Sequence, residues 1–225
     1  MLLALETAND QCSVALYDGG QLLALREDDR AREQTRLILP MIDSALAEAQ
    51  LGMADIRVIA FSRGPGSFSG VRINAAVAQG LAWTHDLPVV PVSTLRAVAQ
   101  AAWRATGISS VVAVLDARMN ELYCAAYQLD GQQLMQAAGV EQLIPYADSS
   151  FAVTGATALA GSGSTLFNPS LSLARYPELH ASAVDVAQLG YADWQAGRAV
   201  TAAEALPVYL RDNAWKKIGE QQRNS

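Results

Sequence analysis

The feature that most constrains this chain is a glycine-rich turn that separates a hydrophobic segment from a run of small residues. Three glycines and one proline fall within seven consecutive positions of this turn. They permit left-handed φ angles and close backbone contacts that other residues resist. Taken alone, such a turn is either a structural element or a site for a phosphate, a nucleotide or another protein. The stretch reads Ser62-Arg63-Gly64-Pro65-Gly66-Ser67-Phe68-Ser69-Gly70-Val71-Arg72.

The common phosphate-binding and hydrolytic motifs do not describe this turn. No Gly-Lys-Ser/Thr ends it, as a P-loop requires, and Ser69 occupies the last glycine position of a dinucleotide-binding fingerprint. The two histidines, His85 and His180, lie outside any recognisable serine, cysteine or zinc hydrolase motif. We therefore expect both imidazoles at surface or capping positions, and no catalytic residue of the nucleophilic type.

Composition limits the remaining classes. A chain of 225 residues with 51% hydrophobic content can bury a large core, as one large domain or two small ones. Its formal net charge of −6 disfavours direct binding to tRNA or DNA. Cys12 and Cys124 lie in apolar segments without a CxxC pattern, so we expect reduced core thiols. No run approaches the roughly 20 apolar residues of a membrane span, and no basic region precedes the first apolar run, which predicts a cytoplasmic protein.

The first half of the chain, residues 1–106, predicts one lobe with a mixed sheet. The hydrophobic periodicity predicts strands at 2–6, 12–17, 21–28, 56–61 and 87–92, and helices from 31 to about 50, 71–84 and 94 to about 104. Pro40 lies inside the first helix and predicts a kink there. The order β-β-β-α-β-α-β-α is typical of a five-stranded mixed sheet covered by helices, the ribonuclease H-like half of actin and sugar kinases. The fold class is α/β.

The second half, residues 107–225, predicts a smaller and less regular lobe. A strand at 111–115 ends at Asp116, and hairpin strands at 122–129 and 133–137 repeat the opening pattern. Residues 155–172 are rich in Gly, Ser and Thr, so we expect loops there rather than a complete second sheet. A helix is predicted at 183–197, and it is a candidate to pack back on the N-terminal lobe. The turn from Asp116 to Glu121 is either a self-paired hairpin connection or a contact for a ligand or partner.

The helix after the glycine turn is unusually rich in small residues, which would let another helix approach closely. Internal burial of this face explains the same pattern equally well, so both alternatives stay open. The small residues are Ala75, Ala76, Ala78, Gly80 and Ala82.

Several separate motifs together resemble one protein family. They are Glu6-Thr7, the glycine turn from Gly64 to Arg72, Pro91 to Leu95, Leu115 to Arg118 with Glu121 and Tyr123, and Pro207 to Arg211. The set is similar to the TsaB (YeaZ) family, bacterial accessory proteins in making threonylcarbamoyladenosine on tRNA. The resemblance covers nearly the whole chain and is strongest up to about residue 127.

This resemblance implies an actin-like ATPase (ASKHA) fold and a set of partners. Members pair with the catalytic relative TsaD through the helix that follows the glycine turn, and they form a homodimer when TsaD is missing. They also help to recruit the ATPase TsaE, and they meet tRNA only indirectly, through the complex. Together these proteins transfer a threonylcarbamoyl group to N6 of the adenosine next to the anticodon.

The resemblance also separates this chain from the catalytic relative. That relative carries a metal-binding Val-Asn-His-Leu-Glu-Gly-His segment, whereas this chain has Val92-Ser93-Thr94-Leu95-Arg96-Ala97-Val98. Thr94 and Val98 stand at the histidine positions, and neither supplies an imidazole nitrogen for a metal. We expect no metal site, no intrinsic cofactor and no peptidase activity, with ATP or ADP bound only at a composite interface.

The prediction is therefore a non-catalytic scaffold. The alternative is an actin-fold small-molecule kinase or nucleotide hydrolase that uses Glu6 and Asp116 around Mg-ATP. Candidate interface or cleft residues are Gly64, Pro65, Gly66, Ser67, Phe68, Gly70, Arg72, Ala76, Gly80, Asp116, Arg118 and Glu121.

Overall fold

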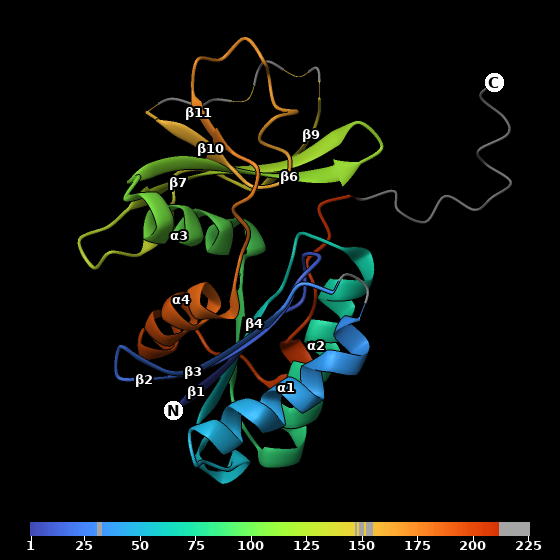
Figure 1. Ribbon diagram of the computed structural model, residues 1–225, viewed down its shortest axis with the longest axis vertical. Helices are drawn as coiled ribbons and strands as arrows, with labels where there is room; N and C mark the ends of the chain where they lie inside the picture. The colour runs from blue at the N-terminus through green and yellow to red at the C-terminus, as the bar shows by residue number, and fades with distance from the viewer. Residues whose placement is uncertain (31–32, 147, 149–150, 152–154, 212–225) are drawn as a thin grey trace, which may run out of the picture.

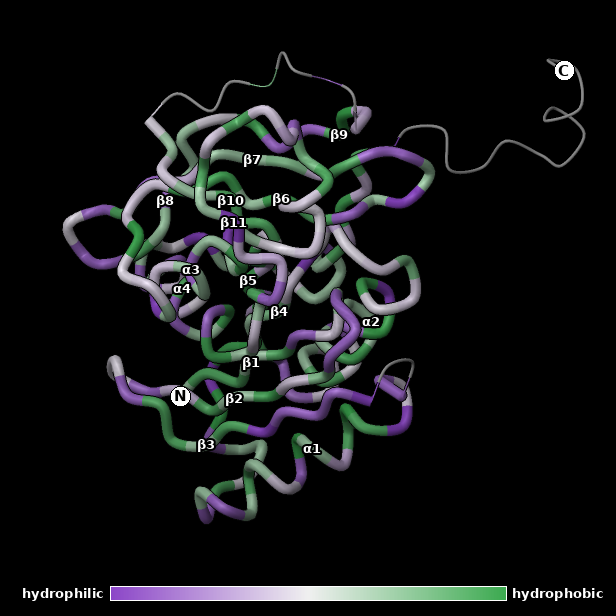
Figure 2. Tube along the Cα trace, turned by 45° about the horizontal axis from the view of Figure 1, so that its top comes forward, coloured by the Kyte–Doolittle hydropathy of each residue, from purple (hydrophilic) through white to green (hydrophobic). Residues whose placement is uncertain are grey.

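The computed structural model shows two β-sheets, one above the other, with helices around and between them (Figure 1). It describes residues 1–30, 33–146, 148, 151 and 155–211. We call the part built on the first sheet the first lobe and the part built on the second sheet the second lobe. Hydrophobic residues follow the strands at the centre of both lobes (Figure 2).

The first sheet is mixed and has five strands, as predicted. Its order is β3-β2-β1-β4-β5. The β1–β2 and β2–β3 pairs are antiparallel, while β1–β4 and β4–β5 are parallel. Leu2 is paired with Tyr17 on one side and with Val58 on the other. The strands are β1 Leu2–Glu6, β2 Cys12–Asp18, β3 Gln21–Asp28, β4 Val58–Ser62 and β5 Val89–Val92.

Helices cover both faces of this sheet, because alternate strand residues point to opposite sides. On one side, Leu3 and Leu5 belong to a core shared with α1 (Gln34–Glu48) and α2 (Phe68–His85). On the other side, Leu2 and Ala4 belong to a core shared with α4 (Ala183–Gln195). Two short 3₁₀ turns complete this lobe, η1 at Met53–Asp55 and η2 at Ala202–Glu204.

Helix α1 carries Pro40 within a single uninterrupted element. Its buried residues Ile38, Ile42, Ala45 and Leu46 follow the predicted helical spacing. The predicted start at Ala31 lies outside the described residues, and the structure begins the helix at Gln34. The polar tail from Lys216 onward also lies outside the described part of the chain.

The second sheet is more complete than predicted. Its order is β11-β10-β6-β7-β8, and β9 pairs with the first half of β7. The expectation of loops alone across 155–172 is wrong, because β10 lies there, parallel to β6 and fully buried. Strand β10 has only three residues, which are too few to show the alternation of apolar and polar residues by which a strand is predicted. The strands are β6 Ser110–Arg118, β7 Glu121–Leu129, β8 Met135–Ala137, β9 Gln142–Pro145, β10 Ala158–Ala160 and β11 Ala174–Tyr176.

Each sheet is covered on one face by a helix from the other half of the chain. Helix α3 (Thr94–Thr106) follows the first sheet in sequence but packs against β6, β7, β8 and β10 of the second. Helix α4 follows the second sheet in sequence but packs on the first. The two helices meet between the sheets (Figure 1), where Arg96 pairs with Asp193 at 2.8 Å and Arg104 with Asp185 at 2.9 Å. A lobe boundary at residue 106 stays a prediction. Helix α3 lies before this boundary in the sequence but packs on the sheet that follows it.

No helix in residues 1–30, 33–146 and 155–211 has the length and apolar character needed to cross a bilayer.

Candidate functional site

The glycine turn is shaped by close contact with the connection between β1 and β2. A Cβ on Gly70 would lie 1.9 Å from the Thr7 carbonyl oxygen, and a Cβ on Gly66 would lie 2.4 Å from that of Ala8. Gly64 has a φ of 100°, in the left-handed region that favours glycine. Only glycine therefore lets the start of α2 come this close to the end of β1.

Polar groups under the turn hold α2 in place. The Gly70 N–H donates to Ser67 Oγ at 3.4 Å, so Ser67 is the N-cap of α2. The buried Asn74 side chain donates to the Leu5 carbonyl at 3.1 Å and to the Ser62 carbonyl at 3.0 Å. The helix is thereby joined to the ends of both β1 and β4.

Glu6 lies beneath this turn and is closed off from solvent, with no exposed surface. Its Oε1 accepts a hydrogen bond from the Ala8 N–H at 2.5 Å. Burial raises the pKa of Glu6 to about 7. Glu6 does not line the cavity described next, so the carboxylate that the kinase alternative requires faces the protein interior.

A cavity of about 620 Å³ lies between the lobes. The structure brings the glycine turn and the Asp116 turn together on its wall, although they are distant in sequence. Pro65, Gly66, Ser67 and Phe68 line one side, and Asp116 and Arg118 line the other. We call this space the inter-lobe cavity.

The two acidic groups of the Asp116 turn, Asp116 and Glu121, are paired within the chain. Asp116 accepts from the Tyr146 hydroxyl at 2.7 Å and from the Arg118 N–H at 2.9 Å, and its other oxygen lies 3.0 Å from the Arg118 guanidinium. The Glu121 carboxylate pairs with Arg211. The turn is thus a self-paired hairpin connection, as one of the two alternatives predicts, and a contact of Asp116, Arg118 or Glu121 with a ligand or partner stays a prediction.

The small residues of α2 divide into two groups. Ala75, Ala78 and Ala82 are buried against the first lobe, whereas Ala76 and Gly80 face outward. The outward group continues to Trp83, whose surface is 77% exposed. We call Ala76, Gly80 and Trp83 the outer face of α2. Trp83 was not among the predicted site residues, although the spacing of 76, 80 and 83 places all three on one helical face.

An aromatic and cationic stack lies at the start of α2. The Arg72 guanidinium is 3.3 Å from the centroid of the Phe68 ring and 5.0 Å from that of Tyr209. Phe68 is 54% exposed and Tyr209 46%. Tyr209 was not among the predicted site residues, because nothing in the sequence places residue 209 beside residue 68.

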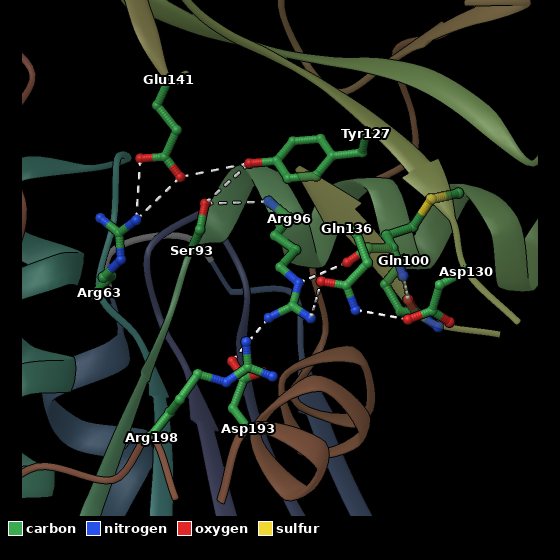
Figure 3. Close-up of polar contacts among 11 residues, drawn as sticks. Arg63, Ser93, Arg96, Gln100, Tyr127, Asp130, Gln136, Glu141, Asp193 and Arg198 are labelled. Atoms are coloured by element: carbon green, nitrogen blue, oxygen red, sulfur yellow. Dashed lines mark hydrogen bonds and ion pairs between the residues drawn. The ribbon is translucent and has the colours of Figure 1, made fainter. Parts of the chain in front are cut away.

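A polar network also joins the lobes next to the glycine turn (Figure 3). The Arg63 guanidinium lies 3.2 Å from the Glu141 carboxylate of the second lobe. The Glu141 carboxylate accepts a hydrogen bond from the Tyr127 hydroxyl at 3.4 Å. The Tyr127 hydroxyl also lies 3.3 Å from the Ser93 hydroxyl. The start of the turn, at Arg63, is thus in contact with the second lobe.

The remaining candidates for chemistry lie elsewhere. Thr94 and Val98 are buried in α3. Cys12 and Cys124 are buried, as predicted, and burial raises the pKa of each thiol to about 12. His85 and His180 are exposed, as predicted. Among the described residues, no three His, Cys, Asp or Glu side chains gather closely enough to hold a metal ion.

Comparison with known proteins places this geometry in a family. A family model for TsaD, tRNA N6-adenosine threonylcarbamoyltransferase, matches residues 28–160. The tRNA threonylcarbamoyladenosine biosynthesis protein TsaB of Escherichia coli K12 is 37% identical over 96% of this chain and 97% of its own length. The chain belongs to the TsaB family. The TsaB protein of Haemophilus influenzae is 52% identical over 54% of this chain and 51% of its own.

A solved structure agrees with the TsaB assignment. YeaZ from Pseudomonas aeruginosa has a TM-score of 0.85 and 38% identity, and the match covers 93% of this chain and 99% of that one. With the mixed sheets and helices described above, this likeness gives the protein the ASKHA-like α/β fold of its family. The TsaB relatives are named as proteins of threonylcarbamoyladenosine biosynthesis, which assigns this chain a role in that pathway.

Proposed function

We propose that this TsaB-family chain is a non-catalytic scaffold for threonylcarbamoyl transfer to N6 of the adenosine next to the anticodon in tRNA. It binds a TsaD-type catalytic partner and helps to recruit TsaE. The observation that carries this proposal is the outer face of α2, where Ala76 and Gly80 lead to the exposed Trp83. Small residues allow close helix approach, and exposed tryptophans are frequent anchors of protein interfaces.

The state of the acidic groups supports a scaffold over a kinase. Mg-ATP chemistry in this fold would need accessible carboxylates at the cavity, since Mg²⁺ prefers oxygen ligands. Glu6 is buried beneath the turn, and Asp116 is occupied by Tyr146 and Arg118. Thr94 and Val98 also lack the imidazoles of the catalytic relative's metal site.

The same face of α2 supports a second contact. When the partner is missing, a second copy would meet it across a two-fold axis, because an isologous contact uses one patch twice. The negative formal charge of −6 favours tRNA contact through the assembled complex rather than by this chain alone. A nucleotide would then bind at a composite interface, and the whole assembly would work in the cytoplasm, where tRNA is modified.

The partner proposal is tested by sizing with light scattering. We expect the chain to co-elute with TsaD, and Gly80→Arg to abolish co-elution because a large cation replaces the smallest residue on the outer face. Gly131→Arg is the matched control, since Gly131 lies on an exposed turn of the second lobe with open space around it. Unchanged co-elution of Gly80→Arg would refute the proposal.

The kinase alternative is tested by calorimetric titration of the isolated chain with Mg-ATP. We expect no tight binding and no turnover until TsaD and TsaE are added. Tight binding or hydrolysis by the chain alone would overturn the scaffold proposal.

A further inference from the structure

A short C-terminal segment contacts both lobes at the edge of the inter-lobe cavity. We call residues 207–211 the clasp. On the first lobe, the Val208 N–H donates to the Arg63 carbonyl at 2.8 Å, next to the glycine turn. The Tyr209 ring lies 6.5 Å from the Phe68 ring of α2. The first half of the clasp is therefore held by a backbone hydrogen bond and by ring packing.

The other half of the clasp is held by the second lobe. The Arg211 guanidinium donates to the Ala117 carbonyl at 3.1 Å, to the Arg118 carbonyl at 3.4 Å and to the Glu121 carboxylate. All three acceptors belong to the β6–β7 hairpin, because Ala117 and Arg118 end β6 and Glu121 begins β7. A planar guanidinium has enough fixed donors to serve several acceptors at once, which an ammonium group does not reproduce.

The turn that Arg211 contacts has an unfavourable backbone. Arg118, Met119 and Asn120 have φ angles of 61°, 56° and 60°. The left-handed region is uncommon for residues other than glycine, and asparagine is the only one of the three with a preference for it. Arg211 donates hydrogen bonds to the carbonyls of Ala117 and Arg118, where this turn begins.

The position of the clasp gives it a mechanical role. Helices α3 and α4 join the lobes between the two sheets, while the C-terminal segment runs past α2 on the other side (Figure 1). Val208, Tyr209 and Arg211 also form part of the cavity wall. The lobes are thus connected by a helix pair on one side and by a thin peptide segment, together with the Arg63–Glu141 pair, on the other.

We propose that residues 207–211 are a clasp that holds the two lobes at their present spacing, with Arg211 as its latch, and that release of Arg211 opens the inter-lobe cavity. The α3–α4 contact is the hinge of this motion. The proposal concerns the chain by itself and does not depend on the scaffold function.

The test measures the spacing of the lobes in the full-length protein. Spin labels are placed at Ser69→Cys on the first lobe and Thr165→Cys on the second, both exposed positions. The native Cys12 and Cys124 are buried and do not compete for label. Pulsed electron–electron double resonance then measures the distance between the two labels in the wild type, in Arg211→Gln and in Tyr209→Ala. Arg36→Gln is the control, because Arg36 pairs with Glu33 within the first lobe.

We expect both clasp variants to shift the label distance to longer values and to broaden it, while the control keeps the wild-type distribution. The two substitutions act on opposite lobes, so purely local damage would not give the same shift. Unchanged distributions in both variants, or a shift in only one of two folded variants, would overturn the proposal. If Arg211→Gln fails to fold, as judged by circular dichroism, the partly exposed Tyr209→Ala decides the question alone.

Discussion

Gly70 lies directly against Thr7 at the point where α2 begins. The Thr7 hydroxyl donates to the Gly70 carbonyl at 2.8 Å, and a Cβ on Gly70 would lie 1.9 Å from the Thr7 carbonyl oxygen. The glycine is therefore required by the end of β1, which is the element that anchors the first sheet. The close approach explains why the turn carries glycine at a helical position, where glycine is otherwise unfavourable.

Replacing Gly70 with alanine is expected to destabilise the fold by about 1–3 kcal/mol, because the added methyl group forces the backbone of β1 and α2 apart. Urea denaturation measures the change. Gly131→Ala serves as the reference, since a Cβ at Gly131 meets nothing within 4 Å. Equal stability of the two variants would mean that the turn can shift without cost.

The buried Glu6 predicts a pH-dependent stability. Its ordinary pKa of 4.5 describes the unfolded chain, and burial raises the pKa to about 7 in the folded protein. The folded state therefore holds the proton more tightly, so the contribution of Glu6 to stability falls as the pH rises from 4.5 to 7. The loss amounts to about 3 kcal/mol.

Glu6→Gln should remove this loss, since the amide keeps an acceptor for the Ala8 N–H and carries no charge to bury. The variant is expected to gain stability over the wild type as the pH is raised through this window. Urea unfolding at a series of pH values tests it, with the exposed Glu178→Gln as the baseline. A constant difference across the window would contradict the assignment to Glu6.

Arg175 organises the segment that follows β10. Its guanidinium donates to the carbonyl oxygens of Ser164, of Phe167 at 2.6 Å, of Asn168 at 2.8 Å and of Leu171 at 3.3 Å. Arg175→Lys keeps the charge but not the planar set of donors. We expect a loss of about 2 kcal/mol and faster amide exchange around Phe167, with Arg36→Lys as the control. Unchanged exchange there would show that the packing of Phe167 holds the segment without Arg175.

Trp83 is predicted to be an energetic centre of the proposed partner interface. Trp83→Ala should weaken binding to TsaD by more than about tenfold, since aromatic anchors of this type contribute about 2 kcal/mol or more. Thermal stability should stay close to that of the wild type, because the side chain is 77% exposed. Calorimetric titration of TsaD into each variant gives the affinity. Wild-type affinity would remove Trp83 from the interface.

Local sequence patterns predicted the first lobe well. The strands of the first sheet alternate or are continuously apolar, and the glycine turn marks the start of α2 within three residues of the predicted position. In the second half of the chain the predicted strands at 111–115, 122–129 and 133–137 and the helix at 183–197 are confirmed. The patterns failed only between them, across residues 155–172. Strand β10 is three residues long, and its side chains Ala158, Leu159 and Ala160 are all buried, so no alternation reveals it.

The sequence by itself determined the order of the elements in the first lobe, the mixed first sheet and the position of the glycine turn, because these depend on periodicity and on local turn composition. The tertiary structure supplied the reason for glycine at 66 and 70, since the backbone of Ala8 and Thr7 lies against them. Only the tertiary structure decided that α3 and α4 exchange sheets and that Asp116 is paired internally. It also decided that Tyr209 lies beside Phe68 and that Arg211 reaches the Glu121 turn. These contacts join residues far apart in the chain, and no local pattern encodes which distant surfaces will meet once the apolar faces are buried.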